Sequence, residues 1–296
     1  MNTKFTITQF LNRFPNNDSC LDEIKKLRWG NDMTCPKCNR RSNFYKIKGR
    51  TAYACQFCGY HLYPLAGTIF DKSSTPLTLW FYAIYLMAQT RSGISAKQLQ
   101  RELGVTYKTA WRMFKQIRIL MAETGGSLLS GDVEIDETFV GGKGSNRATI
   151  PNFNEIPKEI VMGIVERGGK LHTKHIPNTG KWTLIEEIQK NVDRNASIMT
   201  DEYRGYAQLS KYGYRHFTVN HGNTQYTNGQ IHTQNIENIW SQLKRGIFGV
   251  YRHVSKEYLQ SYVNEYSWRY NNRQSGGQMF NLILAQVPAV KMMRTR

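Results

Sequence analysis

Two CxxC motifs constrain the fold of this chain more than any other feature of its sequence. Cys35 and Cys38 form the first motif, Cys55 and Cys58 form the second, and 16 residues separate the two. A CxxC turn directs two thiolates at one tetrahedral ion, and a gap of about 15 to 20 residues allows a hairpin to return the second pair to the first. Core thiols without a ligand are the less favoured alternative. The spacing therefore predicts a zinc ribbon that holds one Zn²⁺.

The four thiolates also limit what such a metal can do. A zinc ion with four cysteine ligands has no open position for a substrate, so we expect it to stabilise the fold rather than to catalyse a reaction. The strand-like sequence between the motifs and Gly59 after the second motif suit a ribbon.

The charge balance favours a polyanionic partner. The 296 residues include 40 Lys and Arg but only 22 Asp and Glu, which gives a net charge of +18. These basic residues are spread through sequence that looks folded, and no basic amphipathic tail stands out. A nucleic acid is therefore favoured over a membrane surface as the binding partner.

The apolar stretch 77–88 has about half the length of a bilayer-spanning helix, so a core helix is expected there. The N-terminal sequence lacks the apolar segment and the small-residue cleavage site of a secretory signal. We expect a cytoplasmic protein, associated with the bacterial nucleoid, without a membrane partner.

Two helices around a tight turn are predicted after this stretch. Ser95 can cap the first helix, Gly104 lies in the turn, and Thr106 can cap the second. The pattern is typical of a helix-turn-helix. Three side chains near the start of the second helix are candidates for contacts with bases and phosphates: Lys108, Thr109 and Arg112. An ordinary helical hairpin is the alternative.

The N-terminal segment and the second half of the chain show different sequence patterns. Residues 1–30 favour one or two short helices, and Ser19 is expected to cap the second with Asp22 in a capping box. Beyond a glycine-rich boundary at 125–127, three consecutive strands, a helix at 182–192, a strand at 197–201 and a last strand near 216–220 are predicted. A loop is expected over residues 141–159. A long helical region follows the last strand.

Three carboxylates in this part could form a divalent-metal site. Asp136 lies in a predicted strand, Asp201 ends another, and Glu237 is expected to be a buried carboxylate of an otherwise apolar helix. Lys244 follows Glu237 after two helical turns, so Lys244 and its neighbour Arg245 could meet a phosphodiester backbone on the same face.

Each carboxylate has a structural alternative when it is considered alone. Asp136 could cap a turn, Asp201 could be a helix N-cap, and Glu237 could pair with Lys244 on the helix surface. Only the ordered set of three favours a metal site.

The motifs EIDETFVGGK, TDEYRGY and HTQNIENIWSQLKRG, which follow a zinc ribbon and a helical region, resemble the insertion-sequence transposases of the ISXO2-like DDE group, relatives of the Merlin transposases. The resemblance extends from about residue 20 to residue 273. It implies an α/β multidomain fold with an N-terminal zinc ribbon and helix-turn-helix, followed by an RNase H-like mixed sheet with packed helices. The expected segments are a helical segment (1–30), the zinc ribbon (31–66), the helix-turn-helix-like DNA-binding region (67–125), the DDE catalytic domain (130–275) and a C-terminal tail (276–296).

The resemblance also implies roles for the three acids. Asp136, Asp201 and Glu237 match the DDE set, and the 35 residues between the last two match the commonest spacing among such enzymes. Lys244 matches the additional lysine of the group. Three carboxylates suffice for two Mg²⁺ or Mn²⁺ ions, which need oxygen ligands and support hydrolysis and transesterification of phosphodiesters.

The expected function is therefore that of a DNA transposase. It would bind the terminal inverted repeats of its element, cut at their ends and join them to target DNA, as a homodimer or a larger synaptic assembly. A sequence-specific zinc and helix-turn-helix regulator and a metal-dependent nuclease without strand transfer are the alternatives.

Overall fold

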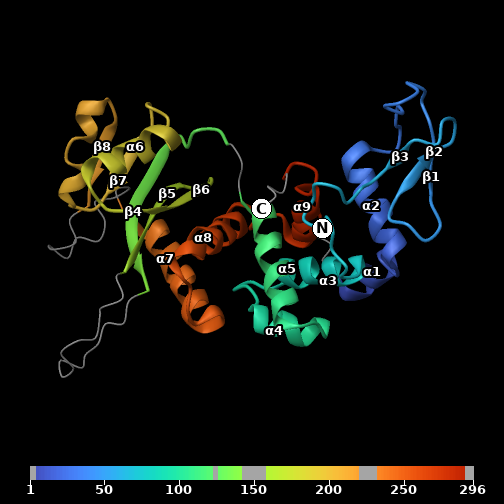
Figure 1. The fold of residues 1–296 in the computed structure, drawn as a ribbon. Coiled ribbons are helices and arrows are strands. Elements are labelled where there is room, and N and C mark those ends of the chain that lie inside the picture. The colour runs from blue at the N-terminus through green and yellow to red at the C-terminus, as the bar shows by residue number, and fades with distance from the viewer. Residues whose placement is uncertain (1–4, 123–125, 142–157, 220–231, 291–296) are drawn as a thin grey trace. The chain divides into compact units, whose positions relative to one another are not determined.

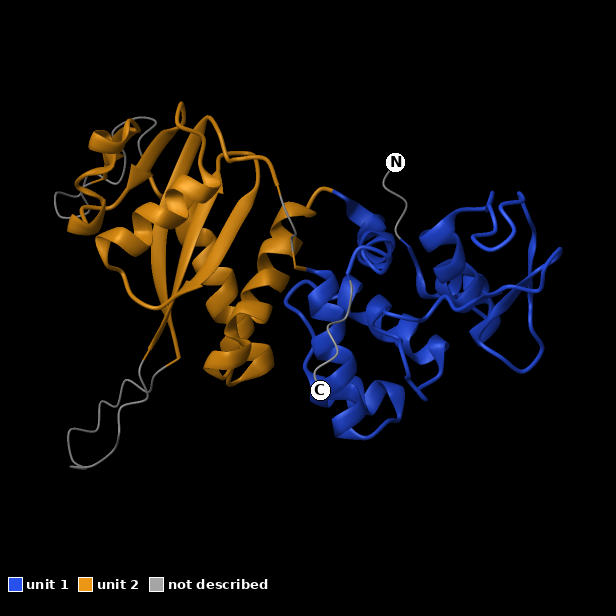
Figure 2. Ribbon diagram, turned by 45° about the horizontal axis from the view of Figure 1, so that its top comes forward, with its two compact units in different colours: residues 1–121, 275–296 blue, residues 122–274 orange. Residues whose placement is uncertain are grey.

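The computed structural model describes residues 5–122, 126–141, 158–219 and 232–290. The chain forms two compact units, shown in different colours in Figure 2. Unit 1 comprises residues 1–121 and 275–296, and unit 2 comprises residues 122–274. Most of the segment expected to be a loop, 142–157, lies outside the described residues. Within those residues, no helix has both the length and the apolar character needed to cross a bilayer.

Unit 1 contains the zinc-ribbon sequence and most of the predicted helices. In chain order its elements are α1 (Ile7–Arg13), α2 (Asn17–Trp29), β1 (Phe44–Lys46), β2 (Tyr53–Cys55), β3 (His61–Leu62), α3 (Leu77–Gln89), α4 (Ala96–Leu103), α5 (Tyr107–Leu120), η4 (Gly276–Gln278) and α9 (Met279–Ala285), labelled where there is room in Figure 1.

Helix α2 begins before the predicted cap. The side chain of Asn16 accepts a hydrogen bond from the Ser19 amide at 2.9 Å, and Ser19 Oγ accepts one from the Asn16 amide at 3.4 Å. The prediction of Ser19 as the N-cap was therefore wrong. Asn16 is an equally favoured cap residue and comes earlier, so Ser19 becomes the third residue of the helix and completes the capping box.

The helix pair α4 and α5 has the predicted turn. Ser95 Oγ accepts from the Gln98 amide at 3.1 Å, and Thr106 Oγ1 accepts from the Thr109 amide at 3.3 Å. Gly104 ends α4 with a φ of 63°, a left-handed conformation that glycine adopts at little cost. Both predicted caps and the glycine turn are confirmed.

Helix α9 belongs to the core of unit 1, where sequence analysis expected only a C-terminal tail. Phe280 is fully buried, and its ring centroid lies 5.6 Å from that of Phe14, 5.7 Å from that of Phe10 and 6.2 Å from that of Phe81. The end of the chain thus closes the aromatic cluster built by α1 and α3.

Unit 2 is built on one sheet. Its elements are β4 (Asp132–Val140), β5 (Glu159–Glu166), β6 (Leu171–Ile176), α6 (Lys181–Asn191), β7 (Ser197–Thr200), η1 (Arg204–Tyr206), η2 (Leu209–Tyr212), β8 (Arg215–Thr218), α7 (Gln234–Gly246), the π-helical turn η3 (Ile247–Tyr251) and α8 (Lys256–Asn271).

The five strands lie in the order β6-β5-β4-β7-β8. Strands β4, β5 and β6 are paired antiparallel, whereas β7 runs parallel to β4 and β8 runs parallel to β7. This order places the first strand of the unit, β4, at the centre. The expected RNase H-like mixed sheet with packed helices is confirmed.

Alternation along β4 divides its side chains between two apolar layers. Val133 and Ile135 face α6 and pack against Leu184 and Ile188. Val140 faces the opposite way, into a second cluster built by α7 and α8. Glu134 and Asp136 have the same parity as Val140 and therefore point toward the α7 and α8 side.

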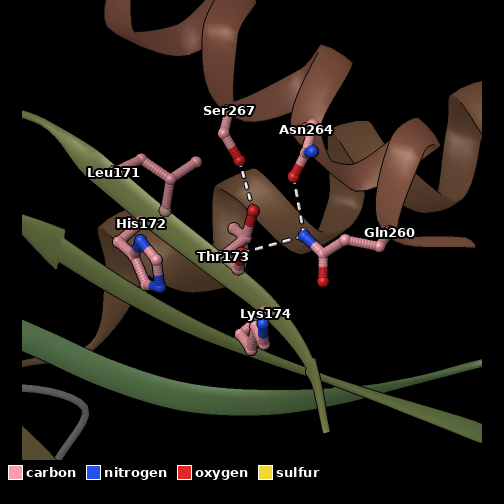
Figure 3. Close-up of a pocket in the computed structure, with 7 residues that line it drawn as sticks. All are labelled: Leu171, His172, Thr173, Lys174, Gln260, Asn264 and Ser267. Carbon is pink, nitrogen blue, oxygen red and sulfur yellow. Dashed lines mark hydrogen bonds between the residues drawn. The ribbon is translucent and has the colours of Figure 1, made fainter. Parts of the chain in front are cut away.

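Helix α8 covers β6, the edge strand of the sheet. Gln260 donates to the Thr173 carbonyl at 3.2 Å and accepts from the His175 amide at 2.7 Å, and Figure 3 shows the first of these contacts. Asn271 pairs with both backbone groups of Leu171, at 2.7 and 2.9 Å. The side chains of α8 thereby provide hydrogen-bond partners for backbone groups that would otherwise be unpaired at the edge of the sheet.

We predict that Phe280→Ala lowers the free energy of unfolding of unit 1 by about 3 to 5 kcal/mol, because it opens a cavity in the aromatic cluster. Hydrogen exchange of α3 peptides, together with denaturant unfolding, measures this loss. Leu11→Ala is the control, since Leu11 is 56% exposed. Equal stability of the two variants would show that α9 is not part of the core.

Candidate functional site

The four cysteines of the two CxxC motifs converge on one point. Their Sγ atoms all lie within 4.8 Å of one another, with Cys35 3.6 Å from Cys58 and Cys38 3.9 Å from Cys55. Two sulfurs bound tetrahedrally to one zinc at about 2.3 Å lie about 3.8 Å apart. The cluster therefore fits a structural Zn²⁺.

The two knuckles repeat the same backbone arrangement. The amide of Cys35 donates to the carbonyl of Arg40, and the carbonyl of Cys35 accepts from the Asn39 amide, both at 2.9 Å. Cys55 makes the equivalent bonds with Tyr60 and Gly59, at 2.9 and 3.0 Å. The residues after the second cysteine of each motif, Asn39 and Gly59, have φ values of 53° and 66°.

Cys20 stands apart from this cluster. Burial raises the pKa of its thiol to about 12, so the thiol stays protonated at neutral pH. Its complete burial in α2 makes it a packed structural residue.

The three residues expected to contact DNA lie at the start of α5 but differ in their surroundings. Lys108 is exposed, whereas Thr109 is half-buried and its hydroxyl lies 3.0 Å from that of Thr106. Arg112 donates to Ser73 Oγ at 3.0 Å and so is engaged within its own unit. Lys108 is the most available of the three.

The parallel pairing of β4 with β7 brings two of the predicted acids together. Glu134 pairs with Met199, so Asp136 and Asp201, each two residues further on, reach the same level of the sheet. Strand β7 ends at Thr200, and Asp201 starts the following turn by accepting from the Tyr203 amide at 3.0 Å. The expected strand-end position of Asp201 is confirmed.

Glu237 lies in the first turn of α7, the helix that covers the face of β4 to which Asp136 points. The prediction that it is buried was wrong, because the buried stripe of α7 runs through Ile236, Ile239 and Trp240 and leaves Glu237 on the exposed side. Thr233 Oγ1 donates to its Oε1 at 3.2 Å.

Lys244 and Arg245 lie in the last turn of α7, and both are exposed. Lys244 follows Glu237 by two helical turns and therefore shares its face. Arg245 donates to the carbonyl and the hydroxyl of Ser241 at 3.2 and 3.1 Å.

The charges of Asp201 and Glu237 act on Asp136. Burial raises the pKa of Asp136 to about 6, and repulsion by Asp201 and Glu237 adds to this increase. Burial, with repulsion by Asp136 and Asp201, also raises the pKa of Glu137 to about 7. A cation among these carboxylates would favour their ionised forms.

The acids surround a common region without closing on one point. Among the described residues, the four cysteines are the group of potential ligands whose atoms all lie within 4.8 Å of one another. The carboxylates of Asp136, Asp201 and Glu237 do not form such a group. Hard oxygen donors of this kind suit Mg²⁺ or Mn²⁺, which retain water and bind substrate phosphate in addition to protein ligands.

Two residues outside the predicted site set also contact this region. Trp240 donates from Nε1 to Asp136 Oδ2 at 2.9 Å. Glu134 is fully buried and binds the start of α7. The shared parity of Glu134 and Asp136 on one strand was the available signal, whereas the contacts themselves depend on how α7 packs.

Two protein-family models match successive parts of the chain. Residues 15–61 match a transposase zinc-ribbon domain, and residues 128–271 match an ISXO2-like transposase domain.

Named relatives agree with these matches. A protein described as uncharacterized, in transposable element ISH50 of Halobacterium salinarum, is 28% identical over 265 residues, which cover 83% of this chain and 88% of that protein. An uncharacterized transposase-like protein of Haemophilus influenzae is 29% identical over 110 residues, covering 37% of this chain and 88% of that protein.

The similarity of this chain to solved structures is weaker. The simian T-cell lymphotropic virus intasome with a PP2A regulatory subunit gives a TM-score of 0.31 at 13% identity, covering 63% of this chain and 67% of that chain. The pre-cleavage Mos1 transpososome gives 0.29 at 10% identity, covering 72% and 79%. The two domain matches and the relatives are the basis for the assignment: the chain contains an ISXO2-like transposase domain, preceded by a transposase zinc-ribbon domain.

Proposed function

We propose that this protein is a DNA transposase that binds the terminal inverted repeats of its mobile element, cleaves phosphodiester bonds at their ends and joins the ends to target DNA. The register of β4 and β7 carries the proposal, because it sets Asp136, on the central strand, level with Asp201, which directly follows the adjacent strand. Glu237 is the third carboxylate of the set, and its charge also acts on Asp136.

Asp136, Asp201 and Glu237 would hold two Mg²⁺ or Mn²⁺ ions. Asp136 has both other acids as charged neighbours, so it would be the shared ligand, with Asp201 and Glu237 each completing one ion. When bound, such ions activate the attacking oxygen and stabilise the charge on the phosphate and on the leaving oxygen. Within the chain, Trp240 holds one oxygen of Asp136 and so orients its carboxylate.

Lys244 would hold a DNA phosphate near the scissile bond. It is exposed and lies on the face of α7 that carries Glu237. Its ammonium group donates hydrogen bonds and carries a positive charge, which suits a phosphate contact better than proton abstraction. Arg245, the next residue, would add a second positive charge for contact with DNA phosphates.

Unit 1 would contribute recognition of the DNA ends. Lys108, Thr109 and Arg112 lie in the first two turns of α5, where a helix-turn-helix addresses the major groove. Two element ends must be processed together, so a homodimer or a larger synaptic assembly is the expected active form.

We expect Asp136→Asn, Asp201→Asn and Glu237→Gln each to lower cleavage of end-bearing DNA by about 100-fold or more, since each removes a carboxylate needed to hold the ions that stabilise the developing charge. Cleavage and joining are measured with Mg²⁺ and with Mn²⁺, and binding is measured separately. Glu186→Gln, which removes a carboxylate that is 67% exposed on α6, is the control.

These assays also separate the alternatives. Variants that cut as well as wild type would overturn the assignment of the acids. Specific binding by a wild-type protein that never cuts would favour a regulator, and cutting without joining would favour a nuclease.

Lys108→Ala should weaken binding to the element ends and reduce by about 1 the slope of log affinity against log salt, because one phosphate contact is lost. Fluorescence anisotropy over a salt series measures both effects. Lys190→Ala is the control, because this lysine pairs with Glu186 on α6. Identical slopes in the two variants would argue against contact between Lys108 and DNA.

Purified protein should contain one structural zinc per chain, and removing it should unfold the ribbon because metal binding supplies folding free energy there. Metal analysis and hydrogen exchange of residues 31–66 provide the test. Cys35→Ala should lose the metal, whereas Cys20→Ala should keep it. Full protection of the ribbon in the metal-free protein would contradict a structural zinc site.

A further inference from the structure

Among the described residues that precede α7, none caps its first turn with a side chain. Thr233 occupies the N-cap position but makes no side-chain cap bond. Its hydroxyl donates instead to Glu237 at 3.2 Å. The amides of the first helical turn, which have no partner inside a helix, must therefore be satisfied from elsewhere.

Glu134 of β4 supplies this cap. Its Oε2 accepts from the amides of Asn235 at 2.9 Å and Ile236 at 3.2 Å, and its Oε1 accepts from Asn235 Nδ2 at 2.8 Å. Those two amides are the ones that an N-cap side chain normally binds. The carboxylate also lies at the positive end of the helix dipole. A strand side chain thus fixes the start of the helix.

Arg167, directly after β5, completes the arrangement. Its Nε donates to Glu134 Oε1 at 2.8 Å, and its Nη2 donates to the His232 carbonyl at 2.8 Å. Glu134 itself is fully buried. A buried carboxylate with a charged partner and several donors holds one geometry, because losing any of these contacts leaves polar groups unsatisfied.

A second contact fixes α7 one turn further along. Asp136 pairs with Gly163 of β5, and a Cβ on Gly163 would lie 2.6 Å from ring atoms of Trp240. The absence of that side chain lets the indole lie against the sheet. From there Trp240 reaches Asp136 Oδ2 at 2.9 Å.

We propose that Glu134 is a positioning residue, which sets α7 on β4 so that Trp240 reaches Asp136 and Glu237 lies near the two aspartates. The proposal rests on the proposed function of the three acids. Glu134 itself would bind neither the ions nor the DNA. It acts through the helix, so its loss should weaken divalent-ion binding and not only stability.

Glu134→Gln is the most informative variant, since it keeps the size of the side chain and removes the charge and one acceptor. Electron paramagnetic resonance of Mn²⁺ titrated into the zinc-loaded full-length protein gives the dissociation constant directly. We expect it to rise by about 10-fold or more, the effect of losing a residue that orients metal ligands. Hydrogen exchange should accelerate in peptides covering 234–246 and stay unchanged in those covering α8.

Asn235→Ala is a milder variant, because it removes one donor to Glu134 and leaves the carboxylate in place. It should shift Mn²⁺ affinity in the same direction by a smaller factor, and it decides the question if Glu134→Gln does not fold. Glu186→Gln is the control for the loss of a carboxylate, and Asp136→Asn shows which Mn²⁺ signal belongs to the acids.

An unchanged Mn²⁺ dissociation constant in folded Glu134→Gln or Asn235→Ala would overturn the proposal and leave Glu134 with a purely structural role. A wild-type protein without the Asp136-dependent Mn²⁺ signal would contradict the proposed function, and with it the positioning role that rests on that function. The two failures are thus distinguishable, since only the second one appears in wild type.

Discussion

The parallel pairing of β4 with β7 is the contact on which the candidate site depends. Residues 65 positions apart become neighbours across this pairing, with Glu134 opposite Met199. The pairing places Asp136 in the centre of the sheet and Asp201 at the end of the adjacent strand. A shift by one residue would turn one of these acids to the opposite face, because side chains alternate along a strand.

Helix α7 adds the third acid, and two different forces hold it in place. Its buried stripe packs on the sheet through Ile236, Ile239 and Trp240. Packing alone leaves some freedom along the helix axis, whereas the hydrogen bonds of Glu134 to Asn235 and Ile236 fix the position of the first turn. Apolar burial therefore supplies most of the attraction between α7 and the sheet, and the buried polar contacts fix the position of α7 along its axis.

Much of this arrangement was predictable from sequence. The cysteine spacing predicted the ribbon, because ligand geometry leaves few alternatives, and alternating apolar residues predicted the strands of unit 2. Three features were not predictable. The exposure of Glu237 depends on which stripe of α7 packs inward, the role of Glu134 depends on a helix about 100 residues away, and the burial of Phe280 depends on the return of the chain end to unit 1.

The proposed function requires that Asp136, Asp201 and Glu237 form one divalent-metal site. Anomalous diffraction from crystals soaked in Mn²⁺ tests it most directly, because it locates the ions without reference to activity. We expect anomalous peaks that have Asp136 as a common ligand, with Asp201 and Glu237 on either side. Mn²⁺ bound only at other carboxylates, at a concentration that supports cleavage, would contradict it.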